Sequence, residues 1–211
     1  EDRFGEAVTL RTLGDIMRLT GRVADAERCY QQAFQASRDH GASWERGMTL
    51  NSYAELARLL GRYAHAAEML DEDIGLQRLR GNRNHLSMAL HNQGHTALRL
   101  GEPDRARTLF SESLALYASM DNRRGVCLCL AGLAGVAARH GRAELAAQLL
   151  AAVSVHLQPL GAHLMGPADQ AEYDWHLAAA KEALGAAAFA AAWDAGRSLT
   201  FEQAVALGEA G

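Results

Sequence analysis

A period of 40 residues constrains the fold of this chain more than any other feature of its sequence. Turn glycines recur with this period at Gly21, Gly61, Gly101 and Gly141. After each turn comes an alanine and then, four positions later, a bulky residue; the pairs are Ala26 and Tyr30, Ala66 and Leu70, Ala106 and Phe110, and Ala146 and Leu150. Internal repeats of this length are typical of helical solenoids, in which each repeat buries its apolar face against its neighbours.

Small residues inside the helices and residues in the loops recur with the same period of 40 residues. The first helix of each repeat carries a small inner residue, at Gly14, Ala54, Gly94 and Ala134. The loops that close the repeats fall at Gly41, Gly81, Asp121 and Gly161. Small inner residues let the two helices of a hairpin approach closely, and glycine adopts the left-handed conformation that ends a helix without a β-carbon penalty.

The composition agrees with a helical fold. Only three of the 211 residues are proline, and the hydrophobic 49% is rich in alanine and leucine, which favours helices over strands. We predict an all-α fold, a right-handed α–α superhelix of about 40-residue repeats with a C-terminal helical cap. The predicted hairpins cover residues 1–41, 42–81, 82–121 and 122–166, and the cap covers residues 167–211.

Each predicted hairpin consists of a first helix (the A helix) and a second helix (the B helix), in which apolar residues recur at helical spacing. The expected A helices are Glu6–Thr20, Trp44–Leu60, Asn84–Leu100 and Arg123–His140, and the expected B helices are Val23–Asp39, Ala64–Leu79, Pro103–Met120 and Ala143–Leu157. Pro103 suits the first turn of its helix, where the missing backbone N–H has no partner to lose.

The period stops after Gly161, and Gly166-Pro167 marks a boundary. Three further helices are expected over Ala168–Leu184, Ala186–Ala195 and Thr200–Leu207, and Thr200 and Gln203 have the spacing of a capping box. Terminal repeats of a solenoid are usually atypical because they must seal an apolar edge. We expect residues 167–211 to form that seal.

Charge and hydropathy exclude several classes of function. A formal net charge of −4 leaves no basic footprint, so direct nucleic-acid binding by this segment is not expected. The longest apolar run, Val126–Ala138, is too short to span a bilayer as a helix, and no signal peptide is visible, so we expect no membrane association. Three cysteines without a disulfide-like framework fit a reducing compartment, and we expect a cytoplasmic location.

The chain begins inside an amphipathic pattern without an initiator methionine, which suggests a piece of a longer protein.

The phase of the small residues resembles that of the tetratricopeptide repeat. That family favours Leu-Gly in the A helix, a turn glycine, alanine in the B helix and an aromatic residue four positions later. The matching residues are Leu13, Gly14, Gly21, Ala26 and Tyr30 in the first hairpin, and Gly94, Gly101, Ala106 and Phe110 in the third. The chain departs from the family in its period, 40 rather than 34 residues, and in lacking the proline that ends the B helix, with Arg38 and Arg78 near that place. HEAT-like repeats rank second, because their proline kink in the A helix is missing.

Residues 47–208 resemble a narrower group, the C-terminal repeat region of LuxR-type and AfsR-like signal-transduction ATPases from actinobacterial-type transcriptional regulators. The similarity is carried by ALHNQGHTALRLGEPDRARTLFSESLALY, by DNRRGVCLCLAGLAGVAARHGRAELAAQLLAA and by the tail AEYDWHLAAAKEALGAAAFAAAWDAGRSLTFEQAVALG. The resemblance implies a sensor or docking module that follows a nucleotide-binding module. This chain has no phosphate-binding GxxxxGK[ST] or GxGxxG motif of its own.

The sequence offers no convincing catalytic or metal centre. His91 and His95 are four residues apart on one A helix and could face one ion, but no third ligand is fixed, and we interpret them as solvent-facing groove histidines. No Ser-His-Asp or Cys-His arrangement can be placed, and Cys127 and Cys129 are interpreted as small core residues. We expect neither enzyme activity nor a cofactor or metal.

In tetratricopeptide solenoids the A helices line the concave face, and helical spacing selects the side chains that point there. The expected ligand or partner groove consists of Arg11, Asp15, Asn51, Glu55, Arg58, His91, His95, Arg99 and Arg139. In the fourth repeat the same positions form an apolar patch, made of Leu128, Ala131 and Gly135. Asn51 and Asn92 resemble part of the family's carboxylate clamp, but the basic partners of that clamp are out of register.

The apolar patch allows two hypotheses. In the favoured one, residues 167–211 fold back and cover the patch; in the other, a peptide or small effector uses it as an anchor. For the whole chain we predict a non-catalytic protein-interaction or effector-sensing module, the C-terminal part of a multidomain transcriptional regulator. Its expected partner is a protein, a peptide or a neighbouring domain of the same chain. The alternatives are a self-association module that forms homo-oligomers and a peptide-pheromone-binding receptor domain.

Overall fold

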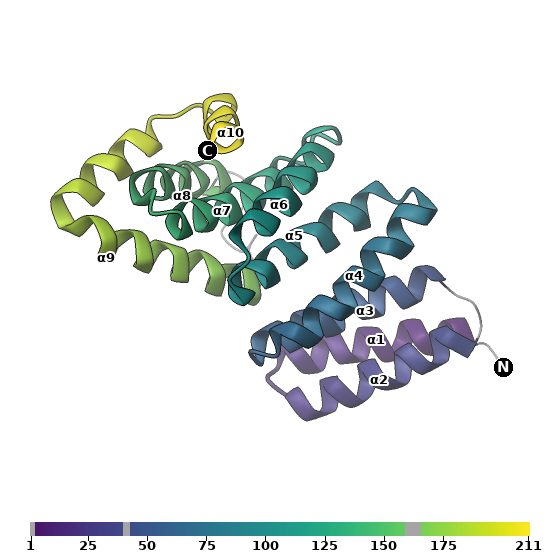
Figure 1. Cartoon of the computed structure of the whole chain (residues 1–211). Coiled ribbons are helices and arrows are strands. Elements are labelled where there is room, and N and C mark those ends of the chain that lie inside the picture. The colour runs from purple at the N-terminus through teal and green to yellow at the C-terminus, as the bar shows by residue number, and fades with distance from the viewer. Residues whose placement is uncertain (1–2, 40–42, 159–165) are drawn as a thin grey trace. The chain divides into compact units, whose positions relative to one another are not determined.

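The computed structural model describes residues 3–39, 43–158 and 166–211, and the described residues form ten α-helices and no strand (Figure 1). The predicted all-α class is confirmed, and the fold is a tetratricopeptide-like helical-repeat solenoid. The helices that correspond to the four predicted hairpins are α1 (Arg3–Leu19), α2 (Val23–Asp39), α3 (Ser43–Leu59), α4 (Tyr63–Arg80), α5 (Arg83–Leu100), α6 (Pro103–Ala118), α7 (Arg123–Arg139) and α8 (Ala143–Leu157).

The turn glycines adopt the predicted conformation. The φ angles of Gly21, Gly61, Gly101 and Gly141 are 76°, 71°, 81° and 75°, all in the left-handed region. Gly81 has a φ of 67°, and Asp121, at the equivalent position of the next repeat, has a φ of 53° without being glycine. The other two loop positions of this phase, Gly41 and Gly161, lie outside the described residues.

The chain divides into two compact units, residues 1–96 (unit 1) and 97–211 (unit 2), and the boundary falls within the α5 sequence. The predicted border between repeats and cap, at residues 166 and 167, does not separate compact units. The reason is that α9 (Pro167–Arg197) packs against α7 and α8, and α10 (Phe201–Ala210) packs against the same two helices. The expected cap is therefore part of the core of unit 2.

Unit 1 packs its helices through small contact residues. Helix α1 lies against α2 and α3, and α3 lies against α4. At Gly14 a β-carbon would come within 2.6 Å of Cε1 of Tyr30, so only glycine allows α1 and α2 to approach this closely. The apolar interior consists of two clusters, one around Leu50 and Leu70 and the other around Tyr30.

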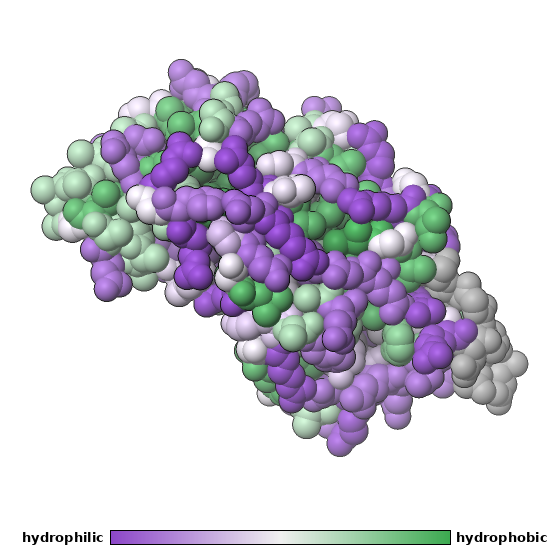
Figure 2. Space-filling model, viewed as in Figure 1, coloured by the Kyte–Doolittle hydropathy of each residue, from purple (hydrophilic) through white to green (hydrophobic). Residues whose placement is uncertain are grey.

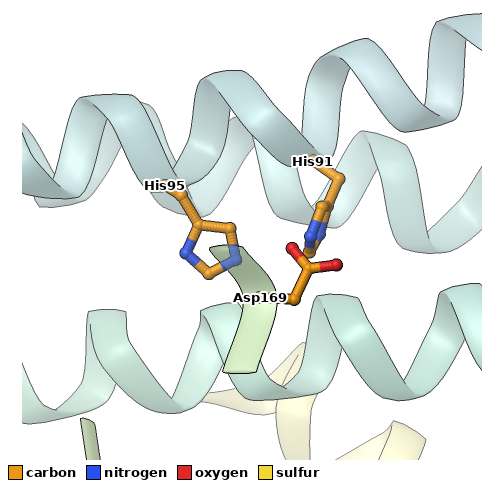
Figure 3. Close-up of side chains that lie close together, drawn as sticks. All are labelled: His91, His95 and Asp169. Carbon is orange, nitrogen blue, oxygen red and sulfur yellow. The ribbon is translucent and has the colours of Figure 1, made fainter. Parts of the chain in front are cut away.

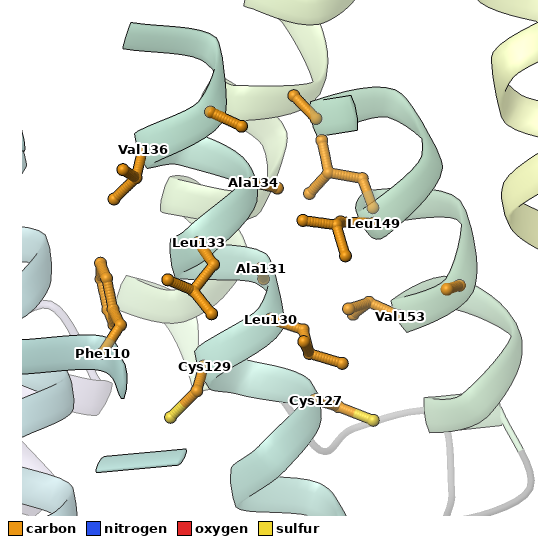
Figure 4. Packing of buried hydrophobic residues seen from close by; sticks show 14 of the residues in the cluster. Phe110, Cys127, Cys129, Leu130, Ala131, Leu133, Ala134, Val136, Leu149 and Val153 are labelled. Atoms are coloured by element: carbon orange, nitrogen blue, oxygen red, sulfur yellow. The ribbon is translucent and has the colours of Figure 1, made fainter. Parts of the chain in front are cut away.

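Unit 2 has one extensive apolar core, with α7 at its centre (Figure 4). Helix α7 contacts α6, α8, α9 and α10, and its residues from Gly125 to Ala137 are all buried. Phe110 of α6 packs on Gly132, where a β-carbon would collide with the ring. An α-helix that is apolar on every side needs such complete coverage.

The C-terminal segment follows the sequence prediction closely. Helix α9 is interrupted at Gly185, whose φ and ψ of 71° and 170° are not helical, so its two parts match the two expected helices. Helix α10 begins after a capping box in which Thr200 and Gln203 bond each other's backbone, as predicted. Figure 2 shows the alanine-rich bend of α9 as a pale green surface at the far left, where Figure 1 draws the same bend.

The apolar patch of the fourth repeat is buried within unit 2. Leu128 and Ala131 are 6% and 5% exposed. A β-carbon on Gly135 would collide with the imidazole of His176 in α9, so this helix lies directly on α7. This agrees with the hypothesis that residues 167–211 fold back over the patch. No helix in the described parts of the chain is long and apolar enough to cross a membrane.

Candidate partner-binding face

The A helices of unit 1 carry a connected set of polar side chains, which we call the A-helix polar network. They come from α1, α3 and the part of α5 that belongs to unit 1, and they are Arg11, Asp15, Arg18, Glu45, Asn51, Glu55, Arg58 and Asn92. Most are three or four residues apart within their helix, the spacing that places side chains on one face. Five of them, Arg11, Asp15, Asn51, Glu55 and Arg58, belong to the predicted groove.

Arg11 links α1 to α3. Its Nε donates to Oε1 of Glu45 at 2.6 Å, and its Nη1 lies 3.3 Å from Oδ2 of Asp15. The Glu45 side chain is fully buried. Burial raises the pKa of Glu45, and the hydrogen bond and charge of Arg11 oppose that rise. The pair thus offsets part of the cost of a buried carboxylate, and the burial remains the larger effect.

Arg18 forms a second link between the same helices. Its Nη2 lies 2.9 Å from Oε2 of Glu55, and its Nε donates to the Tyr30 hydroxyl at 3.3 Å. The Tyr30 hydroxyl in turn donates to Oδ1 of Asp15 at 2.8 Å. Burial, followed by the charge of Asp15, raises the pKa of Tyr30, so this hydroxyl keeps its proton as a donor. Asp15 and Glu55 remain partly accessible, with side chains 27% and 25% exposed.

Arg58 links α3 to α5 through two amides. Its Nη1 donates to Oδ1 of Asn92 at 2.8 Å, and Nδ2 of Asn92 donates to Oδ1 of Asn51 at 2.9 Å. All three residues are buried, at 4%, 2% and 4% exposure. Asn51 and Arg58 were expected in an open groove, but the structure places them in the contact between successive A helices.

The interpretation of His91 and His95 as solvent-facing residues is wrong. They project from one side of α5, and their rings meet edge to face with centroids 4.7 Å apart (Figure 3). Their exposed fractions are only 4% and 2%. Helical spacing correctly placed the two rings on one side of the helix, but it carries no information about what covers that side.

Arg99 and Arg139 do not continue the line of Arg18 and Arg58. Shifting Arg58 by 40 residues gives Leu98, so Arg99 is one position, about 100°, out of register. In unit 2 its Nη2 lies 3.0 Å from Oε2 of Glu172, and its guanidinium lies 3.7 Å above the Trp175 ring. Arg99 therefore binds α9, and Arg139 is an exposed residue at the end of α7.

Glu45 of the polar network, and Tyr30 of α2, which bonds to the network, were not predicted as site residues. The repeat gave no signal for Glu45, because the equivalent positions hold Gly5, His85 and Gly125. Tyr30 was assigned to the scaffold alone because its ring fills the hairpin, although its hydroxyl also orients Asp15. Arg18 was predicted from its spacing to face the groove with Arg11 and Asp15, and Asn92 was noted beside Asn51 as a partial match to the family's carboxylate clamp.

The described cysteines do not suggest covalent chemistry. Cys127 and Cys129 lie in the apolar core of unit 2, as predicted. Burial raises the pKa of Cys127 to about 11 and that of Cys129 to about 12, so both remain thiols at neutral pH. Sγ of Cys129 lies 3.2 Å from the Ser113 hydroxyl.

Comparisons with known proteins agree with this geometry. The crystal structure of BtubC (BKLC) from P. vanneervenii is similar over 94% of this chain and 78% of that chain, with a TM-score of 0.64 and 19% sequence identity, a likeness that concerns the fold alone. A search of curated proteins found no match. The family model for the tetratricopeptide repeat matches residues 5–72, which contain the α1 and α3 parts of the A-helix polar network. This part of the chain is similar to tetratricopeptide repeats.

Proposed function

We propose that this chain is a non-catalytic interaction module that binds a protein or peptide through the A-helix polar network of unit 1. Tetratricopeptide repeats are a protein-interaction scaffold, which supports the general role. The observation that carries the choice of face is the group of partly exposed ion pairs among Arg11, Asp15, Arg18 and Glu55. Of the remaining predicted groove residues, we assign Asn51, Arg58, His91 and His95 to the support of this face.

The ion pairs suit recognition because they hold charged atoms in fixed positions before a partner arrives. Arg18 is held by Glu55, Asp15 and Tyr30 at once, so little side-chain freedom is left to lose on binding. A partner that carries both a basic and an acidic group can extend these pairs without leaving a buried charge unpaired. Such complementarity gives specificity more than affinity.

The test uses a synthetic peptide selected from a random library on the immobilised chain. Its affinity is measured by calorimetry for the parent chain and for Glu55→Gln and Asp15→Asn, with Glu68→Gln as the matched control because that carboxylate is 81% exposed in α4. We expect each network variant to weaken binding about fivefold, the effect of losing a partly exposed ion pair, and the control to bind normally. Unchanged binding in both network variants would remove this face from consideration.

We further propose that the module is the C-terminal sensing part of a multidomain transcriptional regulator of the LuxR and AfsR-like type. The support is the sequence resemblance of residues 47–208 described above. In such a regulator, a partner that binds one arrangement of the module better than another would bias an attached switch. The gene sequence upstream of Glu1 provides the test: a nucleotide-binding module is expected there, and an unrelated segment would contradict this context.

Self-association is a second candidate, favoured by the outer side of α1. Ile16 is 51% exposed, whereas the equivalent residues Leu56, Thr96 and Val136 are 1%, 0% and 2% exposed. Helix α1 thus presents a position that is covered in each later repeat. Light scattering at increasing concentration tests this idea, with Ile16→Glu as the disrupting variant. A strict monomer at high concentration would contradict it.

A further inference from the structure

Unit 2 contains a hollow that none of the roles above uses, which we call the α10 pocket. It has a volume of about 320 Å³ and lies between the end of α6, the start of α7 and one side of α10. Its apolar lining includes Val126, Phe201 and Val205. The volume is at the lower end of the range of small-molecule sites.

Rigid elements fix the aromatic wall of the pocket. Phe201 is the first residue of α10, directly after the Thr200 capping box. The guanidinium of Arg123 lies 4.1 Å from its ring centroid, and the His156 ring meets it edge to face at 5.7 Å. The His156 Nε2 atom is 3.0 Å from the Leu199 carbonyl oxygen, which anchors the imidazole. The pocket is therefore formed before any ligand binds.

The charges around the pocket favour a positive ligand. Its lining contains three carboxylates, from Asp121, Glu202 and Glu209, and one guanidinium, from Arg123. The Arg123 guanidinium lies on the Phe201 ring and offsets one of the three carboxylates, so the lining keeps a surplus of negative charge. A backbone hydrogen bond and nearby groups, among them Arg123, lower the pKa of Glu202, so its carboxylate is ionised at neutral pH.

The starts of α7 and α10 lie beside the pocket, but they do not provide a site for an anion. Helix N-termini attract anions through backbone N–H groups without partners. Here the Asn122 side chain accepts from the N–H of Gly125 at 2.9 Å, and the Thr200 hydroxyl accepts from the N–H of Gln203 at 3.2 Å. Each helix start thus has its own cap, and at the start of α10 the Glu202 carboxylate also accepts a backbone hydrogen bond, so neither helix start offers an anion site.

We propose that the α10 pocket binds a small primary amine that carries an apolar group. The apolar group packs against Val126, Phe201 and Val205, and the ammonium group faces Asp121 and Glu202. The volume suits a ligand of the size of an arylalkylamine rather than a peptide. The biological meaning of this site rests on the sensing role proposed above, since the amine would be the effector. Binding itself requires neither a partner nor a regulator.

The experiment is an NMR titration of the ¹⁵N-labelled chain with four ligands that share one ring: phenethylamine, phenylalanine, phenethyl alcohol and 3-phenylpropionate. Phenethylamine should bind with a dissociation constant on the order of 1 mM, as expected for a ligand of this size, and should shift the amides of the pocket. The neutral alcohol should bind about fivefold more weakly, because it lacks the ion pairs. Phenylalanine should lie between phenethylamine and 3-phenylpropionate, which should not bind. Equal binding of the alcohol, or binding of the propionate, would overturn the proposal.

Two variants locate the site. Asp121→Gly removes one carboxylate but retains the turn, because glycine adopts positive φ more easily than aspartate, and it should weaken phenethylamine binding about fivefold. Ala206→Phe adds a ring to an exposed lining position and should abolish binding while the fold persists. The control Glu182→Gln, an exposed position of α9, should bind normally. Unchanged binding in both pocket variants would refute the site, whereas the peptide-binding assay on unit 1 would be unaffected.

Discussion

Units 1 and 2 are built from the same repeat but have different interiors. In unit 1, buried polar groups such as Glu45, Arg58 and Asn92 connect successive A helices, and the apolar residues form two separate clusters. In unit 2, α7 is apolar on all sides and belongs to one extensive core. The repeat therefore determines where the helices meet, but not which kind of interaction holds them together.

The polar contacts of unit 1 and the apolar core of unit 2 contribute differently to the specificity and to the stability of the fold. Apolar burial stabilises roughly in proportion to area and tolerates small changes of angle. Hydrogen-bonded ion pairs gain little net stability when buried, because desolvation opposes them, but they are satisfied in one arrangement only. We therefore expect unit 1 to fix the spacing of its A helices and unit 2 to provide the more stable body. Opposite responses to pH should make the difference measurable.

The largest expected effect is the acid response of unit 2. Burial, and secondly the charge of Arg99, lowers the pKa of His176 from 6.5 to about 3. The unfolded chain therefore binds a proton between pH 6.5 and pH 3 that the folded unit does not, so stability falls as the pH falls through this window. The total approaches about 5 kcal/mol at 1.4 kcal/mol per pKa unit.

Urea unfolding of a Trp44→Phe variant measures this response, since Trp175 and Trp193 then report unit 2 alone. His176→Gln should remove the dependence on pH. An equally steep loss of stability in that variant would assign the acid response to other groups.

Unit 1 should respond in the opposite direction through Asp73. This α4 residue is 1% exposed and accepts a 2.8 Å hydrogen bond from Gln77. Burial raises its pKa from 3.8 to about 7, against the hydrogen bond from Gln77 and with a smaller contribution from Glu72. Because the folded unit holds the proton between pH 4 and pH 7, stability should fall as the pH rises through this window, by about 4 kcal/mol in total.

The stability of unit 1 is measured by urea unfolding of a variant that carries Trp175→Phe and Trp193→Phe. Trp44, in unit 1, is then the sole tryptophan of the chain and reports the unfolding of that unit. Asp73→Asn should lose most of this fall in stability over the same range. A stability of unit 1 that increases from pH 4 to pH 7 would contradict the assignment and the contrast between the units.

A smaller loss is expected from Arg58→Ala. The substitution removes the donor to Asn92 and leaves a buried amide without its charged partner, which should cost about 3 kcal/mol. Arg28→Ala is the control, because that side chain is 71% exposed and should change stability by less than about 0.5 kcal/mol. If Arg58→Ala behaves like the control, the A-helix polar network does not hold unit 1 together.

The sequence predicted the features of the fold that depend on local chemistry. Turn glycines, small contact residues, the break at Gly185 and the Thr200 capping box act within a few residues or recur with the repeat, so one chain suffices to find them. The helix ends differed by a few residues, because the ends of helices are sensitive to local fraying.

The candidate site was less predictable because its chemistry depends on distant partners. Arg11 could be assigned to a face, but nothing local indicated that Glu45 would be its partner. Arg99 lay one residue outside the register and bound Glu172 of α9 instead of joining Arg58. His91 and His95 were placed on the correct side of α5 and given the wrong exposure. Periodicity thus predicts direction, while burial requires the folded structure.

The smallest expected effect compares one turn position in the two units. Gly81 in unit 1 and Asp121 in unit 2 occupy equivalent places, with φ angles of 67° and 53°. A residue with a β-carbon pays a conformational cost there that glycine does not, so Asp121→Gly should stabilise unit 2 by about 1 kcal/mol and Gly81→Asp should destabilise unit 1 by a similar amount. Urea unfolding with the two sets of tryptophan reporters measures both. If Asp121→Gly instead destabilised unit 2, the Asp121 carboxylate would contribute to the fold itself, and weaker amine binding by this variant would no longer measure the loss of one carboxylate alone.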